Sequence, residues 1–142
     1  MNEIARAHLL ADLKRDEGRM ARMYEDSVGK LTIGYGHNLK DGPPLSDAAM
    51  DQILLDDMAD AENRCRRFPW FADLDDVRQA VIINMAFNLG LGGLAGFRKM
   101  IDALVAGRYD EAAEEMLDSR WSRQVLDRSR RLAAMMRTGE WP

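Results

Sequence analysis

The segment covering residues 81–87 constrains the fold of this chain more than any other. Six of its seven residues are apolar, and Asn84 is the exception. A helix that is apolar nearly all round is stable in water only when other elements surround it. The segment lies inside a longer predicted helix over residues 75–89, which ends at a glycine cluster beginning with Gly90. We therefore expect a helical lobe built around residues 81–89.

Apolar residues at helical spacing predict further helices on both sides of this segment. The first covers residues 2–16, and a long one covers residues 46–67 and is stopped by Pro69. After the central helix, we expect helices over residues 95–106, 110–117 and 126–136, with a short helical turn near Trp121.

The pattern changes to a period of two between residues 20 and 39. Leu31, Ile33 and Tyr35 alternate there with Thr32, Gly34 and Gly36, and turn-forming residues 26–29 come before them. We predict a small β-hairpin or three-stranded sheet with Thr32 and the two glycines on one face. That face has little side-chain bulk, so it either admits a ligand against the backbone or belongs to an edge strand that tolerates glycine.

These elements predict a helix-rich α+β chain that forms a single domain over residues 1–142. We expect a β-containing lobe at about residues 14–45 and a connecting helix at 46–67. The helical lobe would comprise the first helix and about residues 68–142. Two lobes that meet at a small sheet should leave a cleft between them.

Composition excludes several classes of protein. Apolar residues make up 46% and charged residues 31% of the 142 residues, the balance of a folded chain rather than a disordered one. No apolar run approaches the roughly 18 residues of a membrane span. We expect no ordinary secretory signal, because the N-terminus lacks a basic start followed by an apolar stretch. Cys65 is the only cysteine, which excludes an internal disulfide framework.

The net charge of −4 argues against wholesale binding of nucleic acid. It is unevenly distributed, because residues 119–142 carry +4 and the rest of the chain carries −8. The basic tail is either a solvated helical face or a wall that faces an acidic ligand or an internal carboxylate.

Glu17 ends the first predicted helix and continues the apolar stripe of Leu10 and Leu13. A carboxyl group beside apolar surface holds its proton more tightly, as a general acid near neutral pH must. The alternative is that Glu17 is an ordinary solvated residue at a helix end.

Asp26 follows Glu17 by nine residues, and Thr32 follows Asp26 by six. Two carboxylates in different environments beside a cleft fit glycoside hydrolysis. One carboxyl group would protonate the leaving oxygen, while the other carboxylate and the hydroxyl would hold the attacking water. The spacing permits this chemistry without requiring it.

Three motifs follow one another along the first part of the chain: Asp16-Glu17-Gly18, Tyr24-Glu25-Asp26 and Thr32-Ile33-Gly34-Tyr35-Gly36-His37. In this order they resemble the active-site stretch of the phage-type lysozymes of glycoside hydrolase family 24. The buried central helix is matched by residues 83–90, and later landmarks by residues 95–97, 119–121 and 137–141. The resemblance therefore covers nearly the whole chain.

The resemblance implies a muramidase that cleaves the β-1,4 bond between N-acetylmuramic acid and N-acetylglucosamine with inversion. Glu17 would be the general acid, Asp26 the opposing carboxylate and Thr32 the residue that positions water. Gly36 and Asn88 would line the substrate cleft. Supporting ion pairs would join Asp16 to Arg128 and His37 to Asp57.

We expect no cofactor and no metal, since His8 and His37 are the only histidines and no Cys/His spacing fits zinc. The expected partner is bacterial peptidoglycan, and the chain should be a monomer that binds no nucleic acid and spans no membrane. It would accumulate in the host cytoplasm and act on the cell wall after release.

The rival hypothesis is a non-catalytic lysozyme-like module that binds cell wall or a protein partner. The acidic charge and the short segment between His37 and Ser46 motivate that rival.

Overall fold

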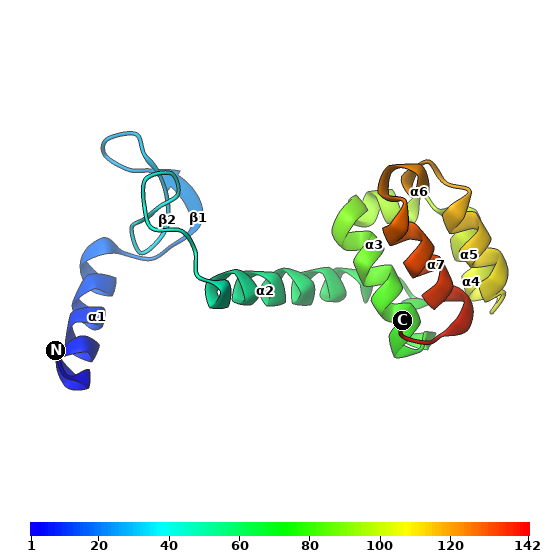
Figure 1. Cartoon of the computed structure of the whole chain (residues 1–142), viewed down its shortest axis with the longest axis horizontal. Coiled ribbons are helices and arrows are strands. Elements are labelled where there is room, and N and C mark those ends of the chain that lie inside the picture. Colours follow the sequence, from blue (N-terminus) through cyan, green and yellow to red (C-terminus); the bar gives the residue numbers. More distant parts are fainter. The chain divides into compact units, whose positions relative to one another are not determined.

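The computed structural model describes all 142 residues of the chain. Its helices and strands are α1 (Glu3–Glu17), β1 (Met20–Glu25), β2 (Leu31–Gly34), β3 (His37–Asn38), α2 (Asp47–Cys65), the 3-10 helix η1 (Phe71–Asp73), α3 (Asp76–Ala95), α4 (Arg98–Val105), α5 (Tyr109–Leu117), α6 (Arg120–Val125) and α7 (Asp127–Thr138). Seven α-helices with one three-stranded sheet confirm the predicted α+β, lysozyme-like fold class (Figure 1).

The chain divides into two compact units, Met1–Ala49 and Met50–Pro142. The first, here called the sheet unit, contains α1 and the three strands. The second, the helical unit, contains most of α2 and all of α3 to α7. The single-domain organisation expected from the sequence stays a prediction.

The sheet is antiparallel with the order β1-β2-β3, so β2 is its central strand. Thr32 pairs with Tyr24 on one side and with Asn38 on the other. The alternative of a glycine-tolerant edge strand is therefore wrong. Because it pairs on both sides, β2 holds Thr32 in a defined position, and this residue is 3% exposed.

The predicted strand face of Thr32, Gly34 and Gly36 needs a correction. The strand β2 ends at Gly34, and Gly36 lies in the turn that leads to β3. Both glycines have a positive φ, +69° and +75° respectively, which side chains of L-residues rarely allow. Glycine at these positions thus reverses the chain direction, which an extended strand through residue 36 could not do.

The helical unit contains the apolar core of the chain, built around α3. This helix buries Val77, Val81, Ile82 and Met85 among residues of η1 and α4 to α7. It bends at Gly90, whose φ is +72°, where the sequence predicted the central helix to end. The sequence predicted that residues 81–87 are buried nearly all round. Phe87 differs from this prediction, because 45% of its surface is exposed.

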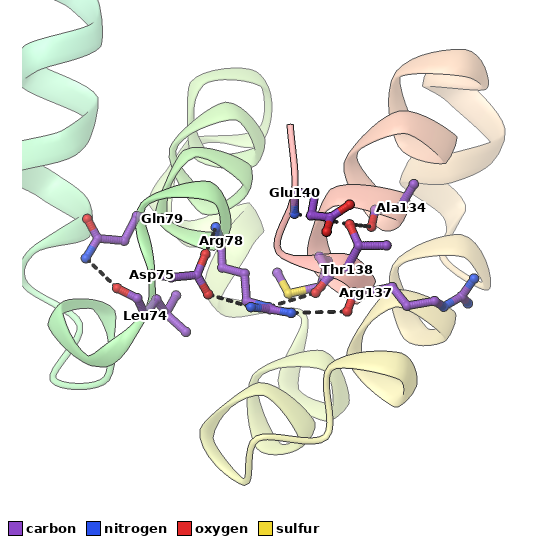
Figure 2. A network of polar contacts seen from close by, with 9 residues as sticks. Leu74, Asp75, Arg78, Gln79, Ala134, Arg137, Thr138 and Glu140 are labelled. Atoms are coloured by element: carbon purple, nitrogen blue, oxygen red, sulfur yellow. Dashed lines mark hydrogen bonds and ion pairs between the residues drawn. The ribbon is translucent and has the colours of Figure 1, made fainter. Parts of the chain in front are cut away.

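Arg78 links the start of α3 to the end of α7 (Figure 2). Its Nε donates to the carbonyl of Met136 at 2.8 Å and its Nη2 to that of Arg137 at 3.1 Å. These carbonyls belong to the last turn of α7, where no helical N–H is available to them. The guanidinium also pairs with Asp75, the N-cap of α3, and stacks on the ring of Tyr109 at 3.7 Å. Burial alone would raise the pKa of Asp75, but the hydrogen bonds and charge of Arg78 outweigh it and hold that pKa below its usual value.

None of the helices combines the length and the apolar character that a helix needs to cross a membrane on its own.

Candidate active site

The carboxylate of Asp26 organises the turn between β1 and β2. Its Oδ1 accepts hydrogen bonds from the backbone N–H of Val28 at 3.0 Å and of Lys30 at 2.8 Å. The turn is closed by the N–H of Asp26, which donates to the carbonyl of Lys30 at 2.9 Å. Gly29, with a φ of +78°, allows the chain to reverse there. One carboxylate oxygen is thus used by the turn, while Oδ2 has no partner within the sheet unit.

The hydroxyl of Thr32 is anchored on the same turn. Its Oγ1 donates to the carbonyl of Lys30 at 2.9 Å. Because that bond uses the only hydroxyl hydrogen, Oγ1 can act toward any further partner only as an acceptor. The peptide groups of Lys30 therefore anchor both Asp26 and Thr32, which the sequence had proposed as partners in holding a water.

Glu17 is the last residue of α1, and its carboxyl group contacts the turn between β2 and β3. A Cβ atom placed on Gly36 would lie 2.8 Å from Oε2 of Glu17, so only glycine leaves room for this carboxyl group. Within the sheet unit, Glu17 forms no hydrogen bond or ion pair and is exposed. The expected apolar surroundings are absent within the sheet unit, where Leu10 and Leu13 are also exposed. The backbone of Gly36, rather than these leucines, is the close neighbour of the acid.

Two asparagines four residues apart on α3 bind side chains from later helices. Oδ1 of Asn84 accepts from Nε of Arg128 at 2.8 Å, and its carbonyl accepts from Nη2 of the same residue at 3.2 Å. Oδ1 of Asn88 accepts from the indole N–H of Trp121 at 2.7 Å. Asn84 is half-buried and Asn88 is exposed, and both side chains accept from side chains rather than from backbone groups.

A hollow of about 700 Å³ lies in the helical unit between the end of α3, the start of α4, the end of α5 and α6. Five charged residues line it, and none of them forms an ion pair: Arg98, Lys99, Glu115, Asp118 and Arg120. The sequence did not single out this hollow, because its wall comes from four separate elements.

Residues 14–138 match the family model described as phage lysozyme. The chain belongs to the phage lysozyme family. It is 27% identical to the protein named "Probable T4-type lysozyme 1" of Dictyostelium discoideum, across 89% of this chain and 92% of that protein. It is 26% identical to the endolysin of Acyrthosiphon pisum secondary endosymbiont phage 1, across 83% and 80% of the two chains. A further similarity, at 29% identity, is to the pre-baseplate central spike protein Gp5 of Enterobacteria phage T4, where 89% of this chain covers 27% of Gp5.

Membership of the phage lysozyme family confirms the resemblance seen in the sequence and makes the chain a lysozyme-like peptidoglycan hydrolase. The matched residues include Glu17, Asp26 and Thr32.

The two ion pairs expected from the phage lysozyme resemblance, Asp16 with Arg128 and His37 with Asp57, would join the sheet unit to the helical unit and stay predictions. Within the sheet unit, Oδ1 of Asp16 accepts from Nε of Arg15 at 3.1 Å. No group of three or more His, Cys, Asp or Glu side chains lies close enough together to hold a metal ion.

Proposed function

We propose that the chain is a muramidase that hydrolyses the β-1,4 bond between N-acetylmuramic acid and N-acetylglucosamine in bacterial peptidoglycan. The observation that carries this proposal is the pair of acceptors at the β1–β2 turn. Within the sheet unit, no donor is bonded to Oδ2 of Asp26 or to Oγ1 of Thr32, and both side chains are anchored on the peptide groups of Lys30. Such a pair suits a water molecule, which has two O–H donors.

In this mechanism, Asp26 and Thr32 hold the attacking water. One O–H of the water donates to Oδ2 of Asp26 and the other to Oγ1 of Thr32, which leaves an oxygen lone pair to attack the anomeric carbon. As the new C–O bond forms, Asp26 accepts the proton of the water. A general base that activates water on one face of the sugar, opposite the acid, inverts the anomeric centre.

Glu17 supplies the proton for the leaving group. Its carboxyl group makes no ion pair and no hydrogen bond within the sheet unit, so it is available there to a glycosidic oxygen. When the glycosidic bond breaks, its electron pair stays on the leaving oxygen, which takes the proton of Glu17. One proton is then lost from Glu17 and one is gained by Asp26, and exchange with solvent restores both groups.

We assign supporting roles to the remaining site residues. Gly36 leaves space for the carboxyl group of Glu17, and Asn88 would contact the sugar chain from the helical unit. The ion pairs of Asp16 with Arg128 and of His37 with Asp57 would hold the two units in their working arrangement. The proposed place of action is the cell wall, reached after release from the host cytoplasm.

Replacing the acid tests the proposed function. We expect Glu17→Gln to lower the clearing rate of outer-membrane-permeabilised bacteria at least about a hundredfold, because an amide cannot donate an acidic proton. Glu25→Gln is a matched control, since Glu25 is another exposed glutamate of the sheet unit. Circular dichroism checks that both variants fold. Clearing by Glu17→Gln at the wild-type rate would remove Glu17 from the mechanism.

A second measurement concerns the stereochemistry. Proton NMR of soluble glycan strands during hydrolysis should show the α-anomer of the new reducing end first, because the broken bond is β. First appearance of the β-anomer would show retention instead of inversion.

The rival function is a lysozyme-like module that binds without catalysis, and the similarity to a spike protein favours its consideration. Wild-type protein that sediments with peptidoglycan but releases no reducing ends would support this rival. Release of reducing ends that is lost in Glu17→Gln would support the enzyme.

A further inference from the structure

An ion pair links the β1–β2 turn to the loop after β3. Nζ of Lys30 lies 3.0 Å from Oδ2 of Asp41, and both side chains are about half exposed, at 50% and 55%. Their contact changes the pKa of Lys30. The hydrogen bond and negative charge of Asp41 raise the pKa of Lys30, and the charge of Asp26 raises it further.

The Lys30 end of this link lies within the proposed water site. Lys30 donates its N–H to Asp26 and accepts from the hydroxyl of Thr32, so any shift of its peptide groups moves both side chains. No other residue of the chain contacts both of them through hydrogen bonds outside the sheet pairing.

The Asp41 end is held firmly by its own loop. Oδ1 of Asn38 accepts from the N–H of Lys40 at 2.9 Å and of Asp41 at 2.7 Å. Gly42 closes this loop directly against the carbonyl of Asn38, where a Cβ atom would clash with backbone. Asn38 is in turn paired with Thr32 in the sheet. The ion pair therefore completes a ring of contacts through Lys30, Asp41, Asn38 and Thr32, and Asp26 is attached to this ring by the N–H of Lys30.

We propose that Lys30 is a positioning residue whose ion pair with Asp41 holds the β1–β2 turn so that Asp26 and Thr32 keep the geometry needed to bind the attacking water. This inference rests on the proposed function. An exposed pair contributes little to stability. Its consequence would instead be catalytic, because small displacements of a base from its water lower the rate of the chemical step.

A competing role for Lys30 is direct binding of an anionic group of the substrate. The two roles predict opposite effects of removing Asp41. If Lys30 acts through Asp41, removal of Asp41 loosens the turn and lowers kcat. If Lys30 binds substrate, loss of Asp41 frees the ammonium group and lowers KM without lowering kcat.

A double-mutant cycle tests the inference on soluble, uncross-linked peptidoglycan strands, for which kcat and KM can be separated. The variants of the full chain are Lys30→Met, Asp41→Ala, the double variant and Lys30→Arg. Lys40→Met serves as the matched control, because Lys40 is a neighbouring exposed cation without an ion pair. Thermal unfolding is measured for each variant.

We expect each single variant to lower kcat about three- to tenfold with KM unchanged, and the double variant to be no worse than either single one. Lys30→Arg should restore most of kcat, and Lys40→Met should behave as wild type. Multiplicative losses in the double variant, a change in KM alone, or an equal loss in Lys40→Met would overturn the inference. If wild-type protein lacks hydrolytic activity altogether, the proposed function fails instead, so the two failures are distinct.

Discussion

At the scale of single residues, backbone groups rather than charged partners position the candidate catalytic side chains. Asp26 binds two N–H groups, Thr32 binds a carbonyl, and Glu17 lies against a glycine. Backbone anchors are determined by the turn and the strand pairing, and within the sheet unit they leave Oδ2 of Asp26 and the carboxyl group of Glu17 without hydrogen-bond partners. The spacing of nine and six residues places Glu17 at the end of α1, Asp26 at the turn between β1 and β2, and Thr32 within the paired strand β2.

Gly36 offers a direct test of this view. Replacement by alanine should cost about 1 kcal/mol of stability, because the positive φ disfavours a side chain. It should also lower kcat more than tenfold, since the new methyl group would displace the carboxyl group of Glu17.

Gly34→Ala is the matched control for that prediction. Gly34 has a similar φ of +69°, but no atom lies within 4 Å of its would-be Cβ. It should therefore share the loss of stability and keep much more of the activity. Equal losses of kcat in both variants would mean that backbone strain, and not the contact with Glu17, limits catalysis.

At the scale of elements, long-range side-chain contacts close the helical unit at its helix ends. Arg78 joins α3, α5 and α7, while Arg128 and Trp121 attach α7 and α6 to the asparagines of α3. Each of these contacts satisfies a polar group that apolar packing alone would leave without a partner. The arginines of the basic tail, residues 119–142, are consequently not equivalent. Arg128 donates a hydrogen bond to Asn84, while Arg130 and Arg131 are exposed.

Replacement of Arg78 by lysine should lower the free energy of unfolding by about 1 to 3 kcal/mol. An ammonium group cannot reach two carbonyls and a carboxylate while it stacks on Tyr109, and the Arg78 side chain is only 11% exposed. Urea unfolding measures the change. Arg64→Lys, on an exposed pair with Asp60, should change stability by less than about 0.5 kcal/mol. Similar effects of the two substitutions would contradict the assigned role of Arg78.

At the scale of the whole molecule, the two units differ in how much apolar surface each one buries by itself. All twenty residues of the apolar core belong to the helical unit, while Thr32 is the one buried residue of the sheet unit. The proposed acid, Glu17, and the proposed base, Asp26, thus lie in the unit that has little apolar core of its own. Catalytic sites commonly use segments that open at low free-energy cost.

Native-state hydrogen exchange should show this asymmetry. We expect amides of β1 and β2 to exchange at least about tenfold faster than those of the buried stretch of α3, because opening the sheet unit exposes less apolar surface. Mass spectrometry of peptic fragments measures the difference. Equal protection of both regions would mean that the sheet unit opens only when the whole chain unfolds.

The sequence alone determined the elements and the family. Apolar periodicity predicted six of the seven helices to within a few residues at most ends, and period-two alternation predicted the sheet, because local spacing decides which face can be buried. The ordered motifs also identified the phage lysozyme family, which the family match confirms.

Only the tertiary structure decided which side chains meet. The contacts of Glu17 with Gly36, of Lys30 with Asp41 and of Arg128 with Asn84 join residues 11 to 44 positions apart. Local spacing carries no information on such pairs, since they depend on where turns reverse the chain. For the same reason, the sequence indicated a continuous strand where positive φ angles at Gly34 and Gly36 turn the backbone toward the candidate acid.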